Sequence, residues 1–225
     1  MSLERLSRSL GHEFRDQGLL LQALSHRSQG ALNNERLEYL GDGLLNFVVG
    51  AALYRRCPQA EEGALSRLRA SLVREESLAR IARSLDLGSL LRLGESEQKS
   101  GGHRRDSILA DALEAIVGAI FLDAGFAAAE ASCLKLFEPL LASLPDPESL
   151  KDPKTRLQEH LQASGRPLPR YEILSESGPP HRREFRVRCS LADVDTHTEA
   201  TGGSRRGAEQ QAAETMLEQL EKADA

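Results

Sequence analysis

Apolar residues in the first part of the chain follow the spacing of α-helices. Up to about residue 144 they recur every three or four positions, and runs of alternating polarity are absent. Residues 37–56 and 107–122 predict two long helices without an internal proline, and the second is almost wholly apolar. The pattern therefore predicts an all-helical domain with the segment 107–122 at its centre.

The pattern changes after a proline-rich segment. Residues 144–153 hold three prolines in polar sequence, which is typical of a domain linker. Beyond it the spacing predicts a helix, three short strands and a second helix, at residues 154–164, 169–176, 184–191, 195–200 and 205–220. We expect an all-α domain over residues 1–145, a linker over 146–152 and a small α+β domain, ordered α-β-β-β-α, over 153–222.

Composition and charge narrow the class of protein. The chain has 225 residues, of which 40% are hydrophobic and only 4% aromatic, so aliphatic side chains must fill its core. The formal net charge of −5 argues against a strongly basic nucleic-acid-binding protein. Contact with a polyanion would need local clusters, and arginines gather in the run 182–188 and at Arg205 and Arg206. The run is equally compatible with a solvated strand face.

Three cysteines lie far apart, without the close pairs of zinc sites or redox motifs. We expect them to be reduced. The longest apolar stretch, residues 44–53, is interrupted by Asn46 and Gly50 and is too short to span a bilayer. The sequence predicts a cytoplasmic protein without a membrane partner.

Acidic residues recur at helical spacing in the first predicted helix. Glu35, Glu38 and Asp42 stand at positions i, i+3 and i+7, so they share one face. Three acids on a helix often form only a solvated face. Here Leu37 and Leu40 lie between them, so the acids cannot all be remote from the core.

The second pair of acids lies in a very apolar setting. Asp111 and Glu114 are the only charged residues in the segment 108–122, and they stand one helical turn apart. Buried acids need a partner, which is either a metal ion or an arginine such as Arg36 or Arg69.

Acids from two helices would form a site of oxygen ligands, which suits Mg²⁺ or Mn²⁺. A di-iron bundle would require Glu-x-x-His motifs, and the chain has none. Magnesium sites of this kind mainly serve phosphate chemistry. The acids therefore point to a metal-dependent reaction at a phosphate.

These acids belong to a recognisable motif. The segment NERLEYLGD at residues 34–42 closely matches the hallmark motif of the ribonuclease III family. Further matches in the family's order and spacing lie at residues 23–28, 62–70, 101–102 and 104–115. The chain resembles bacterial ribonuclease III over nearly its whole length. Gly43 departs from the pattern, because the family usually has serine there.

The resemblance implies a homodimeric, magnesium-dependent endonuclease of double-stranded RNA, with Mn²⁺ as a plausible substitute. Its products would carry 5′-phosphate and 3′-hydroxyl ends, and its substrates would be ribosomal-RNA precursors and structured messages. The family's metal ligands match Glu38, Asp42, Asp111 and Glu114, of which Asp42 and Glu114 are closest to the chemistry. Glu35 and Glu62 match its dimer-interface acids.

Residues 153–222 are similar to the double-stranded-RNA-binding domain. The resemblance implies that RNA is contacted from the first helix, from the loop between the first two strands and from the start of the last helix, by Thr155, Gln158, Glu159, Gln162, His181, Ser204, Arg205 and Arg206. Gly207 stands where the family often has a third basic or polar residue, and Glu209 adds negative charge. We therefore expect modest RNA affinity from this domain by itself.

Two alternatives remain at this point. One is a duplex-RNA-binding protein whose helical domain is catalytically idle, and the presence of all four acids weighs against it. The other is a metal-dependent hydrolase of small phosphate compounds, and the predicted RNA-binding domain weighs against that.

Overall fold

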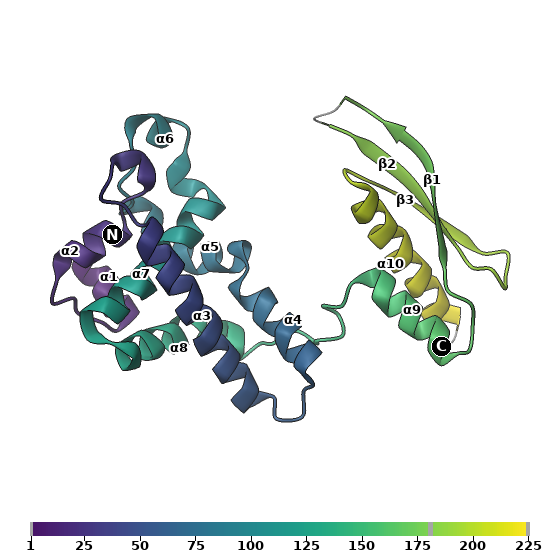
Figure 1. Ribbon diagram of the computed structural model, residues 1–225, viewed down its shortest axis with the longest axis horizontal. Helices are drawn as coiled ribbons and strands as arrows, with labels where there is room; N and C mark the ends of the chain where they lie inside the picture. Colours follow the sequence, from purple (N-terminus) through teal and green to yellow (C-terminus); the bar gives the residue numbers. More distant parts are fainter. Residues whose placement is uncertain (1, 180–181, 224–225) are drawn as a thin grey trace. The chain divides into compact units, whose positions relative to one another are not determined.

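The structure, a computed structural model, describes residues 2–179 and 182–223 (Figure 1). The chain divides into two compact units, one up to Pro147 and the other from Glu148 onward. The first unit is helical, and the second contains a helix, three strands and a helix. The predicted fold class, an all-α domain followed by a small α+β domain, is confirmed. Across the described residues, none of the helices is both long and apolar enough to traverse a bilayer.

Side chains cap the starts of the first two helices of the first unit. The side chains of Ser2 and Asp16 accept hydrogen bonds from the first turns of α1 and α2, and Gly11 ends α1 in the left-handed region at φ 74°. The helices are α1 (Leu3–Leu10), α2 (Gln17–Ala23), α3 (Glu35–Arg56), α4 (Glu62–Val73), α5 (Glu75–Ser84), α6 (Glu95–Lys99), α7 (Asp106–Ala124) and α8 (Phe126–Leu141). Short 3₁₀ turns lie at Arg27–Gln29, Leu87–Ser89 and Gly102–Arg104.

Helix α7 forms the centre of the first unit, as its apolar sequence predicts. It packs against α2, α3, α5 and α8, so almost every side of it is covered. Its fully buried residues include Leu113, Ile116, Val117 and Ile120. The only acids beyond its first turn and before its last are Asp111 and Glu114, which are partly buried on the side that faces α3.

Two glycines let the backbones of α3 and α7 come into contact. A Cβ atom on Gly41 would overlap the carbonyl of Glu114, and one on Gly118 would overlap the carbonyl of Leu37. Because no side chain separates the helices there, the first half of α3 lies directly on α7 (Figure 1). This crossing sets the distance between the acids of the two helices.

The second unit is a three-stranded antiparallel sheet with two helices on one face (Figure 1). Its elements are α9 (Pro153–Ala163), β1 (Arg170–Ser177), β2 (Glu184–Ser190), β3 (His197–Gly202) and α10 (Arg205–Ala223), with strand order β1-β2-β3. Val187 of β2 pairs with Ile173 and Ala200, and a register shift follows Ile173. Leu157, Leu161, Cys189 and Met216 form its core with neighbouring residues of α10.

The helix crossing leads to a stability prediction. We expect Gly41→Ala to lower the free energy of unfolding of the first unit by about 3 kcal/mol or more, because the added methyl group collides with backbone that cannot rotate away. Gly43→Ala is the matched control. A Cβ there meets no atom within 4 Å, so this change should raise stability by up to about 1 kcal/mol. Denaturant unfolding measures both values, and a Gly41→Ala variant as stable as Gly43→Ala would contradict the crossing.

Candidate metal centre and RNA-binding face

The acids predicted from two separate segments meet where α3 crosses α7. Glu38 of α3 and Asp111 and Glu114 of α7 each offer a carboxylate oxygen, and these atoms lie within 4.8 Å of one another. All three side chains are partly buried. Asp42 lies one turn further along α3, is more exposed and accepts a hydrogen bond of 2.8 Å from Asn46 Nδ2. We call these four residues the acidic cluster.

The acidic cluster is electrostatically unfavourable without a cation. Burial, followed by repulsion from Asp42, Asp111 and Glu38, raises the pKa of Glu114 to about 8. Burial is also the largest cause that raises the pKa of Glu38 and of Asp111. A group of oxygen ligands that repel one another in this way fits a hard divalent cation.

The alternative of a buried ion pair is wrong for these residues. Within the described part of the chain, neither Asp111 nor Glu114 forms an ion pair with an arginine. Arg36 lines a different hollow, beside Tyr39 and Leu122, and Arg69 lines another beside Glu62. Both side chains therefore lie in other parts of the surface.

A hollow of about 420 Å³ lies next to the acidic cluster. Glu38 and Asp111 line one part of it, and Arg27 and Arg105 bring positive charge to the same space. Sequence reasoning did not single out these two arginines. Both arginines lie in segments that carry the family resemblance, Arg27 in residues 23–28 and Arg105 in residues 104–115. These segments could have pointed to them. Both arginines are paired with acids of the same hollow, Arg27 with Glu35 and Arg105 with Glu97 at 2.9 Å. The hollow thus combines acids for a cation with arginines whose charge is partly balanced.

Buried Asn34 adds a polar group to the hollow. It is 2% exposed, it lines the hollow, and its side-chain Nδ2 lacks a hydrogen-bond partner among the described residues. A buried donor without a partner is costly in a folded protein, unless a bound group satisfies it. The hollow therefore has the character of a binding site.

The two predicted dimer acids lie apart from each other within one chain. Glu35 begins α3 beside the hollow, and its carboxylate is 3.8 Å from Arg27 Nη1. Glu62 begins α4 in a separate groove with Tyr54 and Arg69, and it accepts a hydrogen bond of 2.8 Å from Ser66 Oγ. Neither belongs to the group of three converging acids.

A row of large apolar side chains stands exposed on the first unit. Tyr39, Phe47 and Tyr54 of α3 are 84%, 63% and 73% exposed, and Leu122 of α7 is 54% exposed. The spacing along α3 is eight and then seven residues, which keeps the three rings on one side of the helix. Three of the nine aromatic side chains of the chain thus lie on one exposed face, which is typical of a surface that another protein covers.

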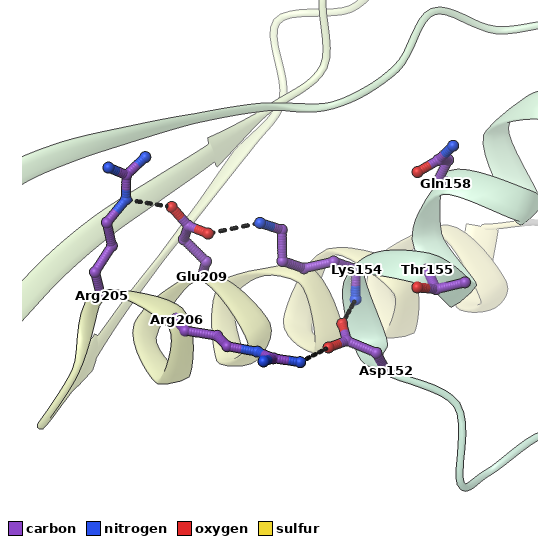
Figure 2. Close-up of a pocket in the computed structure, with 7 residues that line it drawn as sticks. All are labelled: Asp152, Lys154, Thr155, Gln158, Arg205, Arg206 and Glu209. Carbon is purple, nitrogen blue, oxygen red and sulfur yellow. Dashed lines mark hydrogen bonds and ion pairs between the residues drawn. The ribbon is translucent and has the colours of Figure 1, made fainter. Parts of the chain in front are cut away.

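The second unit brings four of its eight predicted RNA-binding residues to one place. Thr155 and Gln158 of α9 and Arg205 and Arg206 of α10 line one open hollow of about 620 Å³ (Figure 2). Three further residues line this hollow, Asp152, Lys154 and Glu209. They were not among the residues predicted to bind RNA.

The remaining predicted residues lie elsewhere. Glu159 and Gln162 are exposed on α9 outside this hollow, and Glu159 accepts a bond of 2.7 Å from Lys151. Ser204 caps α10 by accepting a bond of 3.1 Å from the Gly207 backbone. His181 lies outside the described residues.

The arginine run is largely neutralised by acids on the sheet. Arg186 and Arg188 both bond to Glu199 of β3, at 2.6 and 2.7 Å, and Arg183 bonds to Glu176 of β1 at 2.6 Å. These arginines hold neighbouring strands together. The arrangement favours a solvated strand face over an RNA contact for this run.

Comparison with known proteins agrees with both units. Residues 16–140 match the family described as ribonuclease-III-like, and residues 153–220 match the double-stranded RNA binding motif. Ribonuclease 3 of Alkalilimnicola ehrlichii is 58% identical, over 97% of this chain and 96% of its own length. Ribonuclease 3 of Methylococcus capsulatus is 57% identical, over 97% and 95% of the two chains.

A solved structure of the nuclease domain of ribonuclease III from Campylobacter jejuni matches with a TM-score of 0.60 and 49% identity, covering 61% of this chain and 97% of that one. For that nuclease domain, structural flexibility is described in the region involved in dimer formation. The family match covers more than half of the chain, and the two ribonuclease 3 sequences match it along nearly its whole length. This chain therefore belongs to the ribonuclease III family.

Proposed function

We propose that this chain is an endoribonuclease that hydrolyses phosphodiester bonds of double-stranded RNA and leaves 5′-phosphate and 3′-hydroxyl ends. The observation that carries the proposal is the acidic cluster, in which acids from α3 and α7 converge and repel one another. The RNA-binding motif in the same chain supports RNA as the substrate. A helical domain without catalytic activity would gain nothing from a group of acids that lowers its stability.

The acidic cluster would hold the catalytic metal. The family is divalent-metal-dependent, and we propose Mg²⁺, with Mn²⁺ as a substitute, held by Glu38, Asp42, Asp111 and Glu114. When bound, the metal supplies an activated water and neutralises charge on the phosphate. Asp42 and Glu114 would lie closest to the reacting atoms. Arg27 and Arg105 would draw the RNA phosphate into the hollow beside the cluster.

The second unit would bind the duplex. A-form RNA presents 2′-hydroxyl groups in a wide, shallow minor groove, which polar side chains of an exposed helix can contact. Thr155, Gln158, Glu159 and Gln162 of α9 would make these contacts. Arg205 and Arg206, with Ser204 directly before them, would bind phosphates at the start of α10. His181, which lies between β1 and β2 in the sequence, would make a separate contact with the RNA.

A homodimer would place two cutting sites on one duplex. The exposed row Tyr39, Phe47, Tyr54 and Leu122 supplies an apolar surface for a second copy. A twofold axis suits the antiparallel strands of duplex RNA, because each site can then cut one strand. Glu35 and Glu62 would lie at this interface.

The three free cysteines support action in a reducing compartment, which we propose is the cytoplasm. There the substrates would be ribosomal-RNA precursors and structured messages.

The rival function is that of a duplex-RNA-binding protein without catalytic activity. Such a protein would not cleave RNA at any metal concentration.

Removing one acid tests the catalytic role directly. We expect Glu114→Gln to lower the cleavage rate of duplex RNA by about a thousandfold or more while RNA affinity stays within about twofold, because the variant loses a charged ligand but keeps the side-chain shape. Glu13→Gln, an exposed acid outside the cluster, is the control and should cleave normally. Near-normal cleavage by Glu114→Gln at saturating Mg²⁺ would refute the assignment.

The raised pKa of Glu114 makes stability depend on pH. Because this pKa is about 8 in the folded protein and ordinarily 4.5, the folded state binds the proton more tightly than the unfolded state. The resulting stabilisation is complete below about pH 4.5 and disappears as pH rises through about 8.

In EDTA, we therefore expect the melting temperature of the first unit to fall by about 3–5 °C between pH 6 and 8. Glu114→Gln should flatten this dependence, and Mg²⁺ should reverse it because the ion favours the charged carboxylates. Differential scanning calorimetry measures the transition. Identical pH dependence in Glu114→Gln and in Glu13→Gln would show that Glu114 does not carry the effect.

A further inference from the structure

Glu209 is a buried carboxylate between the two helices of the second unit. It is 7% exposed, and Figure 2 shows it between Arg205 and Lys154. Its oxygens accept hydrogen bonds of 2.8 Å from Arg205 Nε and 2.5 Å from Lys154 Nζ. Burial acts to raise the pKa of Glu209, but these bonds outweigh it and leave that pKa below its ordinary value. Glu209 is therefore a charged residue held by two cations.

The bond to Lys154 joins the start of α9 to the first turns of α10. The Lys154 ammonium lies 4.4 Å from the ring centroid of Tyr171, so it is held between an acid and an aromatic face. Thr155 follows Lys154 directly, and Gln158 lies one turn later on the same helix. The bond between Lys154 and Glu209 thus helps to fix these polar side chains relative to the start of α10, together with the bonds that Asp152 accepts from Arg206 and Gln210.

The bond to Arg205 fixes a side chain that otherwise has many rotamers. Arg205 is exposed and binds Glu209 through Nε, while its terminal nitrogens point away from the acid (Figure 2). A guanidinium held at Nε keeps its outer donors for a phosphate. Ordering the side chain before binding removes part of the entropy that binding would otherwise cost.

We propose that Glu209 is a positioning residue for duplex RNA, which holds Arg205 and the first turn of α9 in the geometry that binds the duplex. The inference rests on the proposed role of this face in RNA binding. Charge alone predicts the opposite effect, because an acid beside Arg205 and Arg206 would weaken the attraction of this face to a polyanion. The two views predict opposite signs for the loss of this acid.

The test measures RNA affinity of the full chain in EDTA, where cleavage does not proceed, with a duplex of about 20 base pairs over a range of salt concentrations. We expect Glu209→Gln to bind about tenfold more weakly than the unmodified chain, and the slope of log affinity against log salt to fall by about one. Glu214→Gln is the matched control. It removes the same charge from α10 and also breaks a bond to α9, that of 3.1 Å to Arg156, but Glu214 does not line the hollow.

Glu209→Asp gives a second variant that keeps the charge. The aspartate is one methylene shorter and cannot reach both Lys154 and Arg205, so we expect it to bind more weakly as well. Circular dichroism at the assay temperature shows whether each variant is folded, and a folded Glu209→Asp carries the test if Glu209→Gln unfolds.

Several results would overturn the proposal. Affinity of Glu209→Gln equal to or higher than that of the unmodified chain would show that the acid does not position Arg205 and α9 for the duplex. So would Glu209→Asp with unchanged affinity. An equal loss in Glu214→Gln would assign the effect to general packing of α9 on α10. By contrast, an unmodified chain that fails to prefer duplex RNA over duplex DNA would refute the proposed function itself.

Discussion

The direct backbone contact between α3 and α7 is the constraint on which the first unit depends. Gly41 and Gly118 remove the side chains that would hold the helices apart, and the contact brings Glu38 close to Asp111 and Glu114. The assembly costs stability, because carboxylates that repel one another are placed in a partly buried setting. Packing of the apolar surface of α7 against four neighbouring helices offsets this cost. Core and site are therefore parts of one helix pair.

The two units use glutamate in opposite ways. Glu114 lies among other acids, and its pKa is raised, so it is suited to receive a metal ion. Glu209 lies between two cations, and its pKa is lowered, so its charge is already balanced within the protein. The residue type is the same, and the neighbours decide whether the side chain binds a ligand or orients another residue.

Patterns along the chain predicted those features that depend on local sequence. The near absence of charge in α7 predicted its central position, and alternating polarity predicted the three strands. Spacing could not reveal the contact between Gly41 and Gly118, because it does not say which helices cross or where. Nor could it show that Glu199 neutralises Arg186 and Arg188, since that depends on strand register. From the sequence, Glu209 was only a negative charge that opposes RNA binding. Its burial could not be predicted, because it depends on how α9 packs on α10.

We propose that the crossing of α3 and α7 creates a divalent-metal site. A crystal structure of the full chain soaked in Mn²⁺, with anomalous difference density collected for the metal, tests this most directly. We expect a peak between the two helices, coordinated by carboxylates of the acidic cluster, and no such peak in Glu114→Gln at the same Mn²⁺ concentration. Absence of a peak at the acidic cluster in the unmodified chain under saturating Mn²⁺ would contradict it.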